Sequence, residues 1–166
     1  MSDALRMRFD VQAAEVSGRK LRAFSREAFG EVGYQWDEQF KMRHFEQGAE
    51  NQYSYKPRSP KYLARKKGGF ISGRGGSRYP IPGGGQLPIV YTGATRSAVR
   101  QRLFPRTYPT RVTISLPTPS YVRMRPYKRN APSLGEELTA VTDTEYSDLE
   151  ATYQRIVEGR INEAIN

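Results

Sequence analysis

The sequence predicts an α+β fold in which a small antiparallel sheet is packed by a long N-terminal helix and a C-terminal helix. Two segments predict the sheet, because every second residue is apolar over 5–11 and again over 112–116. Two stretches with apolar residues at intervals of three or four, over about 19–46 and 143–164, predict the helices. A long Gly/Arg-rich extended loop or arm lies between them. The length of 166 residues suits a single domain over 1–166.

The predicted N-terminal helix is marked by one apolar stripe, which would make about seven turns if the helix is continuous. Glycine destabilises a helix interior by roughly 1 kcal/mol relative to alanine, so Gly30 and Gly33 predict a kink or break. Two residues of the stripe and one of the C-terminal helix are candidates for a helix core or a subunit interface: Trp36, Phe40 and Tyr153. The stripe consists of Leu21, Phe24, Ala28, Val32, Trp36 and Phe40.

Residues 47–86 are predicted to form an extended, basic, Gly/Pro-rich connector and arm. The helical periodicity stops after residue 46, and two prolines that follow favour extended backbone. Residues 68–85 hold eight glycines and two prolines, and such a segment loses too much backbone entropy to fold alone. We therefore expect a long loop that becomes ordered against a partner. A short helix is expected to start near Thr92.

The residues after the arm predict the rest of the sheet and the last helix. The strand over 112–116 is followed by a Pro-Thr-Pro turn and a second alternating run over 121–125, which predicts an antiparallel hairpin. Residues 137–141 are expected to form a final strand or a strand-like extension. Thr142 and Glu145 match a capping box, so the last helix should begin directly after Thr142.

The net charge of +10 is unevenly distributed along the chain. Residues 1–55 have a net charge of −1, residues 56–131 contain seventeen Lys/Arg and no acidic residue, and residues 132–166 have a net charge of −6. Because a basic segment of this length repels itself, it needs a polyanion, an acidic partner or the acidic end of a neighbouring copy. The composition therefore favours a binding or structural protein over an enzyme.

The basic segment supplies the candidate interface residues. Lysine and arginine neutralise phosphates, and aromatic side chains between them can stack on bases. The same side chains could equally be solvated loop charges or meet an acidic protein surface. No RNA-recognition, zinc-finger or helix-turn-helix signature accompanies them. The candidates for a surface that faces DNA or a neighbouring subunit are Arg65, Lys66, Lys67, Arg74, Arg78, Arg96, Arg100 and Arg102.

Residues with catalytic, metal-binding or cofactor-binding chemistry are scarce. The chain has no cysteine, which excludes disulfides, thiolate zinc sites and cysteine nucleophiles. Its one histidine, His44, is more simply structural, and helix-face ion pairs explain the carboxylate pairs. The glycine run ends without the Gly-Lys-Ser/Thr of a phosphate-binding loop. We expect no catalytic, metal or cofactor residues, no enzyme activity, and no membrane-spanning or signal segment.

Three stretches resemble the morphogenesis proteins of tailed phages, namely their minor tail, tail-completion and neck components. Such chains carry a helical N-terminal half, an R-S-x-x-Y-x-x-x-K stretch and a P-L-x-x-T-G-x-L-R-x-S stretch before a β-rich half. This chain departs from the last pattern at Thr95 and Ala98, where the family has leucine and serine. The matching stretches are Trp36…Arg43-His44-Phe45, Tyr55…Pro57-Arg58-Ser59-x-x-Tyr62-x-x-x-Lys66-Lys67, and Leu87-Pro88-Ile89-Val90-Tyr91-Thr92-Gly93.

The resemblance implies a structural virion protein, localised at the head–tail junction or in the tail after assembly in the host cytoplasm. It implies a homo-oligomeric ring, such as a head–tail connector, neck or tail-terminator ring, beside portal-adaptor or tail-tube proteins, with packaged DNA passing through the lumen. The residues themselves leave open an alternative. The chain could be a nucleic-acid-binding accessory protein, associated with ribosomes or DNA, that uses the basic region over 56–131.

Overall fold

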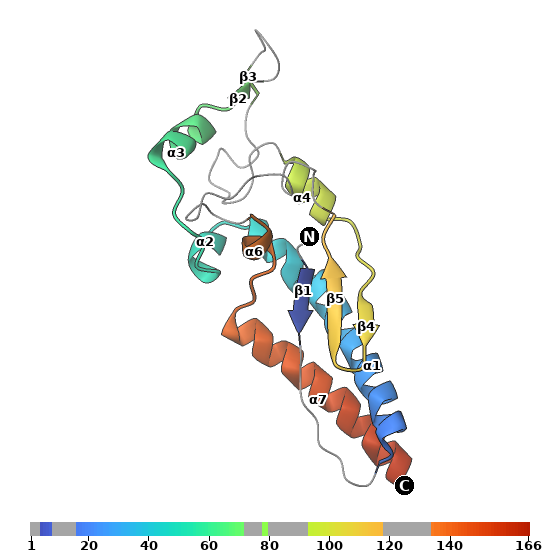
Figure 1. The fold of residues 1–166 in the computed structure, drawn as a ribbon. Coiled ribbons are helices and arrows are strands. Elements are labelled where there is room, and N and C mark those ends of the chain that lie inside the picture. The colour runs from blue at the N-terminus through green and yellow to red at the C-terminus, as the bar shows by residue number, and fades with distance from the viewer. Residues whose placement is uncertain (1–3, 8–15, 72–77, 80–92, 118–133) are drawn as a thin grey trace. The chain divides into compact units, whose positions relative to one another are not determined.

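The computed structural model describes residues 4–7, 16–71, 78–79, 93–117 and 134–166, and it confirms the α+β class (Figure 1). The two longest helices, α1 and α7, enclose most of the shorter elements along the sequence, and β1 precedes them. In chain order they are β1 (Ala4–Met7), α1 (Gly18–Gln35), η1 (Trp36–Phe40), η2 (Lys41–Phe45), α2 (Ala49–Gln52), α3 (Pro60–Lys67), β2 (Phe70–Ile71), β3 (Arg78–Tyr79), α4 (Ala94–Val99), β4 (Arg106–Tyr108), β5 (Arg111–Ser115), α6 (Leu134–Leu138) and α7 (Asp143–Ile165).

The chain forms two compact units that are interleaved along the sequence. Unit 1 is built from residues 41–101 and 117–140. Unit 2 is built from residues 2–40, 102–116 and 141–166, so the chain enters and leaves unit 1 twice. The organisation as a single domain stays a prediction.

Unit 2 contains a three-stranded antiparallel sheet with the strand order β1-β5-β4. The central strand β5 pairs on both sides, with Leu5 opposite Ile114 and Thr107 opposite Val112. The predicted alternation holds along β5, since Val112 and Ile114 have no exposed surface. β4 and β5 form an antiparallel hairpin in which the partner of β5 precedes it along the chain. The hairpin partner predicted over 121–125 lies outside the described residues.

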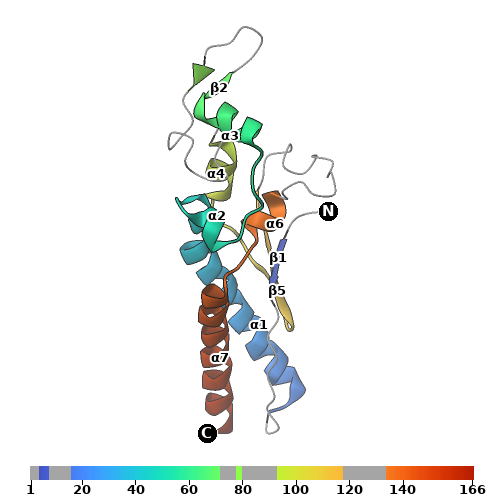
Figure 2. The same ribbon diagram turned by 90° about the vertical axis from the view of Figure 1, so that its left-hand side faces the viewer.

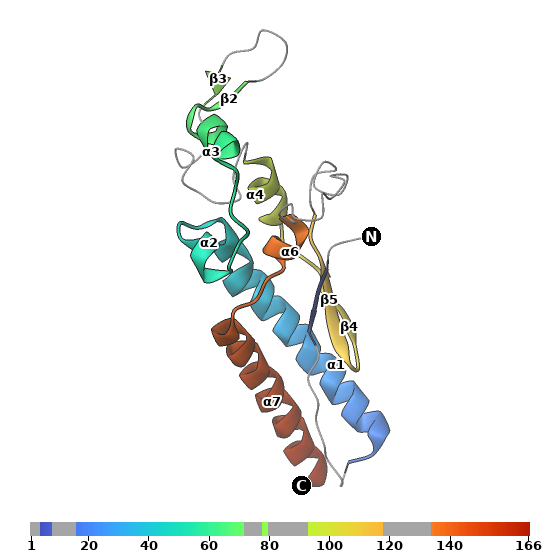
Figure 3. The same ribbon diagram turned by 60° about the vertical axis from the view of Figure 1, so that its left-hand side comes forward.

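Helix α1 lies against the sheet on one side and along α7 on another (Figures 1 and 3). It begins at the predicted place, where the Ser17 hydroxyl accepts a backbone hydrogen bond at the N-cap. Gly33 is needed for packing, because a Cβ there would lie 2.7 Å from Pro105 Cβ and 3.0 Å from Val112 Cγ2. The predicted break does not occur, since α1 continues through both glycines to Gln35. Close packing of the hairpin offsets the low helix propensity of glycine at this position.

The helical run changes form after α1. η1 is a π-helix and η2 a 3₁₀-helix, where the periodicity predicted one α-helix continuing to about residue 46. The wider π turn coincides with the burial of Asp37, whose carboxylate accepts a hydrogen bond from the backbone N–H of Leu103 at 3.3 Å. The apolar stripe itself is correctly predicted, since Trp36 and Phe40 are 0% and 1% exposed.

Helix α7 runs antiparallel to α1, and the two lie side by side (Figures 1 and 2). The predicted capping box is confirmed, with Thr142 Oγ1 accepting from Glu145 N and Glu145 Oε2 accepting from Thr142 N, both at 3.2 Å. Tyr153 joins the helices: its ring centroid is 4.8 Å from that of Phe29, and its hydroxyl donates to Ser25 Oγ at 3.0 Å.

Unit 1 consists of short helices where the sequence predicted mainly extended chain. α2 and α3 interrupt the predicted connector over 47–86, and β2 pairs with β3 in a two-stranded ladder within it. α3 forms because the Ser59 hydroxyl accepts from the N–H of Tyr62 at 3.2 Å and Pro60 occupies the first helical position. One of the two prolines that favoured extended backbone, Pro60, thus marks a helix start.

Of two further elements of unit 1, one differs from the prediction and the other confirms it. Leu134–Leu138 form helix α6, where a strand or strand-like extension was expected over 137–141. The segment lacks the apolar alternation of a half-buried strand. At the end of α6 the Thr139 hydroxyl donates to the carbonyl of Gly135, one helical turn earlier, at 2.9 Å. The short helix expected near Thr92 is α4, and its N-cap is Gly93 at φ +82°, without a side-chain capping bond.

Candidate functional site

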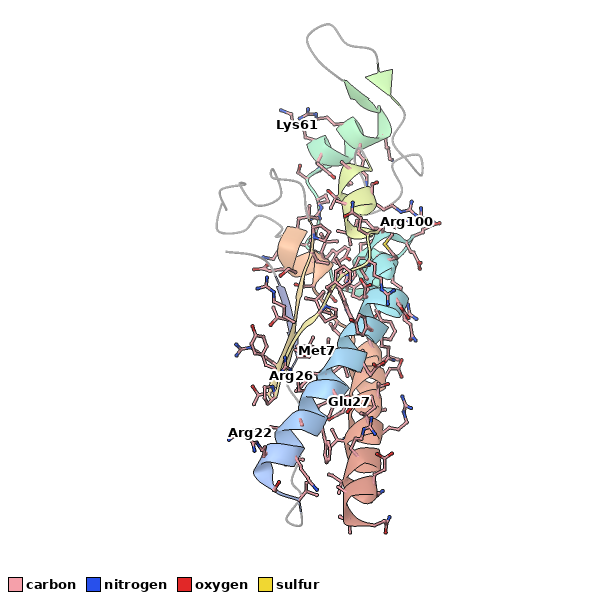
Figure 4. All side chains as sticks on the ribbon, turned by 90° about the vertical axis from the view of Figure 1, so that its right-hand side faces the viewer. Met7, Arg22, Arg26, Glu27, Lys61 and Arg100 are labelled. Atoms are coloured by element: carbon pink, nitrogen blue, oxygen red, sulfur yellow. The ribbon has the colours of Figure 1, made fainter. Side chains whose placement is uncertain are left out.

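The basic candidates of unit 1 lie on two short helices, α3 and α4. On α3, Arg65 and Lys67 are exposed, and Lys61 lies one turn before Arg65 on the same face. Neither helix contains a carboxylate. Figure 4 shows the Lys61 side chain projecting from α3. This surface of α3 is therefore available to an acidic partner or to phosphates.

The second basic surface belongs to α4. Arg96 and Arg100 are exposed and four residues apart, whereas Thr95 and Val99 on the other face are buried. The positive φ of Gly93 turns the chain into this helix and so fixes which face is exposed. Arg96 and Arg100 therefore lie on one exposed face of α4, and what binds there stays a prediction.

Lys66 differs from its neighbours because it is buried, with 2% of its surface exposed. Burial lowers the pKa of the Lys66 ammonium, the nearby Arg58 charge lowers it further, and Glu50 opposes both effects. Lys66 is therefore part of the interior of unit 1, and its position removes it from the surface that Arg65 and Lys67 offer. This burial could not be predicted from the run Arg65-Lys66-Lys67, because three consecutive basic residues are typical of a solvated helix end.

Residues 58–66, which match the R-S-x-x-Y-x-x-x-K stretch of the phage proteins, stabilise unit 1. Arg58 forms a bidentate ion pair with Glu137, in which Nη1 donates to Oε1 at 2.8 Å and Nη2 donates to Oε2. Glu137 is 7% exposed, so this pair is largely desolvated. Ser59 caps α3 and Lys66 is buried beside Arg58. This pattern is therefore explained by folding, without any ligand.

His44 belongs to the same interior. Its ring stacks on Tyr53 with centroids 4.0 Å apart, and its Nδ1 lies 2.7 Å from the hydroxyl of Tyr55. Burial lowers the pKa of His44 to about 4, and a hydrogen bond with the backbone of Glu137 opposes this shift. His44 is thus neutral at pH 7 and has no exposed surface, which matches the structural role expected for it.

The remaining sequence candidates are placed differently. Arg74 lies outside the described residues, and Arg78 is described as part of β3, where it pairs with Ile71 in the ladder. Arg102 belongs to unit 2, where it is exposed and its guanidinium lies 5.7 Å from the ring centre of Tyr34. The predicted basic set is therefore divided between the two units.

The candidates for a helix core all lie in the core of unit 2. Trp36, Phe40 and Tyr153 are each at most 1% exposed. They stabilise this unit and do not present a surface to another subunit. The exposed aromatic residues that could do so are others, including Phe104 at 80% and Tyr108, whose ring centre is 4.7 Å from the Arg111 guanidinium.

Unit 2 also contains an open groove of about 560 Å³ that the sequence analysis missed. It runs between α1 and the segment that leads through β4, and arginines border it. No linear motif marks it, because its walls come from segments more than seventy residues apart. The periodicity of Arg22, Arg26, Gly30 and Tyr34, each one turn after the last, is the one signal that could have pointed to it. The lining residues are Arg22, Ala23, Arg26, Glu27, Gly30, Tyr34, Pro105, Thr107 and Pro109.

Within the described residues, no group of three or more His, Asp or Glu side chains is placed to hold a metal ion. The helices in that part of the chain include none that is both long and apolar enough to cross a lipid bilayer. Comparison of the chain with protein-family models, with curated proteins and with solved structures gives no match.

Proposed function

We propose that this chain is a structural subunit of a tailed-phage virion that forms a homo-oligomeric ring at the head–tail junction or in the tail. The observation that carries the proposal is the separation of charge. Several exposed basic side chains of unit 1 stand on α3 and α4, helices without a carboxylate, whereas α7 of unit 2 has six carboxylates and two arginines. A chain with opposite charges on different surfaces complements further copies of itself.

The resemblance to neck and tail-completion proteins supports the same proposal. In such a ring the basic surfaces of α3 and α4 face either the DNA path or an adjacent subunit, and both environments are acidic. The ring joins the portal side of the junction to the tail. No step of this function requires a catalytic group, and the buried His44 and Lys66 act in stabilising unit 1.

The second candidate is a nucleic-acid-binding accessory protein, and the exposed basic residues of α3 and α4 are the observation that favours it. The five exposed cations on the surfaces of α3 and α4 can neutralise several phosphates, which gives binding that weakens steeply with salt. The two proposals differ in what the free chain does. A ring subunit self-associates and binds free DNA weakly, whereas an accessory protein binds DNA as a monomer.

The test is sedimentation velocity of the full chain from low to high micromolar concentration, combined with negative-stain imaging of the largest species. We expect discrete oligomers with a central hole. A chain that stays monomeric over this range, and never enters virions when supplied during infection, contradicts the ring.

Fluorescence anisotropy with a labelled DNA duplex at two salt concentrations distinguishes the alternative. Tight, salt-sensitive binding by the monomer, abolished in an Arg65→Glu/Lys67→Glu/Arg96→Glu/Arg100→Glu variant, favours the accessory protein. The matched control is Arg19→Glu/Lys20→Glu/Arg22→Glu/Arg102→Glu, which reverses the same number of charges on exposed residues of unit 2.

A further inference from the structure

The β4–β5 hairpin of unit 2 has an inner face that packs on α1 and an outer face that is exposed (Figure 4). Alternate residues of the segment through β4, namely Pro105, Thr107 and Pro109, line the groove beside α1. Successive side chains along a strand point to opposite sides of the sheet, so the residues between them belong to the outer face. These residues are Phe104, Arg106 and Tyr108, and all three are exposed.

Strand β5 completes this outer face. Arg111 and Ser115 are exposed and Thr113 is half-buried, whereas the two residues between them are buried on the inner face. The register places Arg106 opposite Thr113, and Tyr108 opposite Arg111. Side chains at opposed positions are neighbours on one face of a sheet. The outer face therefore combines two aromatic rings, two arginines and two hydroxyls.

Phe104 is 80% exposed, more than any other large apolar side chain that the structure describes. The residues on both sides of it are anchored in unit 2. Leu103 is buried and its N–H donates to the Asp37 carboxylate at 3.3 Å, and Pro105 packs closely against Gly33. The backbone thus holds the Phe104 ring outward before any partner arrives, and such preorganisation reduces the entropy lost on binding.

The second ring of the outer face is paired with an arginine. The guanidinium of Arg111 lies 4.7 Å from the ring centre of Tyr108, so two planar groups are held against each other. Unpaired nucleic-acid bases stack on aromatic rings and on guanidinium planes alike. In the part of the chain that the structure describes, neither Arg106 nor Arg111 forms an ion pair with a carboxylate. Both charges are therefore available to phosphates.

The chemistry of this face distinguishes between possible partners. Charged residues are depleted from the core of protein–protein interfaces, yet here an arginine separates the two rings. The bases of a DNA duplex already stack on one another, so exposed rings add little to duplex binding, whereas unpaired bases can use them. The outer face has no carboxylate or amide side chain for a ribose 2′-hydroxyl, the group by which a protein selects RNA. Single-stranded DNA is therefore the ligand that uses the whole face.

We propose that the outer face of the β4–β5 hairpin binds single-stranded DNA. Bases stack on Phe104 and on the Tyr108–Arg111 pair, and the arginine charges neutralise the phosphates between them. The hydroxyls of Thr113 and Ser115 donate hydrogen bonds to phosphate oxygens. The inference goes beyond the proposed ring and does not depend on it, because every residue that it uses belongs to unit 2 of one chain.

The experiment measures fluorescence anisotropy of a labelled single strand with the full chain. The probe is an oligothymidine of about 12 nucleotides, a length that a small single-strand-binding surface covers, and a duplex of the same length is compared with it. We expect the single strand to bind more tightly. Phe104→Ala/Tyr108→Ala should weaken its binding by about 10–100-fold and leave duplex binding unchanged. The matched control is Tyr146→Ala on α7, which removes a ring with the same 41% exposure as Tyr108 and should bind like the unchanged chain.

The arginines are tested by the salt dependence of the same binding. Each phosphate contact to a single strand contributes about 0.7 to the slope of log K against log salt concentration. Arg106→Gln/Arg111→Gln should therefore lower this slope by up to about 1.4. The control is Arg65→Gln/Lys67→Gln, which removes two exposed charges from α3 of unit 1 and should leave the slope unchanged.

Several results overturn the inference. It is wrong if the unchanged chain does not bind oligothymidine, or if Phe104→Ala/Tyr108→Ala, shown to be folded by circular dichroism, binds it as tightly as before. Loss of binding in the α3 variant instead would place the single strand on unit 1. Tighter binding of an oligouridine of the same length would assign the face to RNA.

A different role for the hairpin face is tested by sedimentation velocity of the aromatic variant. If Phe104→Ala/Tyr108→Ala loses oligomers but keeps its affinity for oligothymidine, the face is a subunit contact and the inference is wrong, while the ring stands. If the unchanged chain binds oligothymidine through the hairpin but never oligomerises, the proposed function fails and this inference stands.

Discussion

The two units of this chain are stabilised in different ways. Among the described residues, unit 2 buries fourteen apolar side chains and three polar ones, whereas unit 1 buries five of each. Unit 2 is an apolar core between two long helices and a sheet. Unit 1 is held by the Arg58–Glu137 pair, the His44–tyrosine stack and the buried Lys66. The free energy of unfolding of unit 2 should therefore be most sensitive to the loss of buried side-chain volume. That of unit 1 should be most sensitive to the loss of a buried charge and to pH.

The largest effect is expected from an apolar truncation in unit 2. Trp36→Ala removes a side chain with no exposed surface, so the free energy of unfolding should fall by about 3–5 kcal/mol, measured by urea denaturation. The control is Phe104→Ala, which removes an aromatic ring that is 80% exposed and should change stability by less than about 0.5 kcal/mol. Equal losses for the two variants would contradict the assignment of the core.

Breaking the ion pair of unit 1 should have the next largest effect. Glu137→Gln leaves the largely buried Arg58 without its counter-charge, so we expect a loss of about 3 kcal/mol. Replacing both partners, as Arg58→Met/Glu137→Leu, should recover most of that loss, because no buried charge remains. A double variant less stable than the single one would show that the pair is a net source of stability, contrary to this account.

Acid should destabilise unit 1 through His44. Its pKa is about 4 in the folded chain and 6.5 when exposed, so the unfolded chain takes up a proton between these values and the folded chain does not. The contribution of neutral His44 to the free energy of unfolding is therefore complete above pH 6.5 and is lost as the pH falls towards 4. The loss is at most about 3 kcal/mol. His44→Phe should be less stable at pH 7 but should lack this part of the pH dependence. Urea denaturation at a series of pH values measures both, and identical slopes would refute the role of His44.

The smallest effects concern the glycines of α1. Gly33→Ala places a Cβ against Pro105, and such overpacking costs about 1–3 kcal/mol. The higher helix propensity of alanine offsets roughly 1 kcal/mol of this cost, so we expect a net loss of stability. Gly30→Ala meets only an ordinary contact and should be neutral or stabilising by up to about 1 kcal/mol. Thermal denaturation distinguishes the two signs. A stabilising Gly33→Ala would mean that the hairpin does not approach α1 this closely.

The sequence predicted unit 2 better than unit 1. The stripe of α1, the alternation of β5 and the Thr142–Glu145 capping box are local patterns, and each of them is confirmed. The change to π-helix at Trp36 was not predictable, because it accompanies a hydrogen bond between Asp37 and a backbone group 66 residues away. Periodicity reports a buried face but not the hydrogen-bond pattern of each turn.

The candidate site was predicted in part. Arg65, Lys67, Arg96, Arg100 and Arg102 are exposed, as an interface requires. The burial of Lys66 could not be predicted, because it depends on the fold that brings Glu50 and Arg58 near it. The groove was equally hidden, since α1 and β4 come together only in the folded unit.

The interleaving of the two units also determines when each one can form during protein synthesis. Ser25 leaves the ribosome early, yet its partner Tyr153 is 128 residues later in the chain. At about 5–20 residues per second, roughly 6–25 s separate the two. During that interval the apolar face of α1 lacks its covering helix, and a chaperone or a second nascent chain can reach it. The emergence of α7, and not of α1 or the sheet, therefore sets the earliest moment at which unit 2 can complete its core.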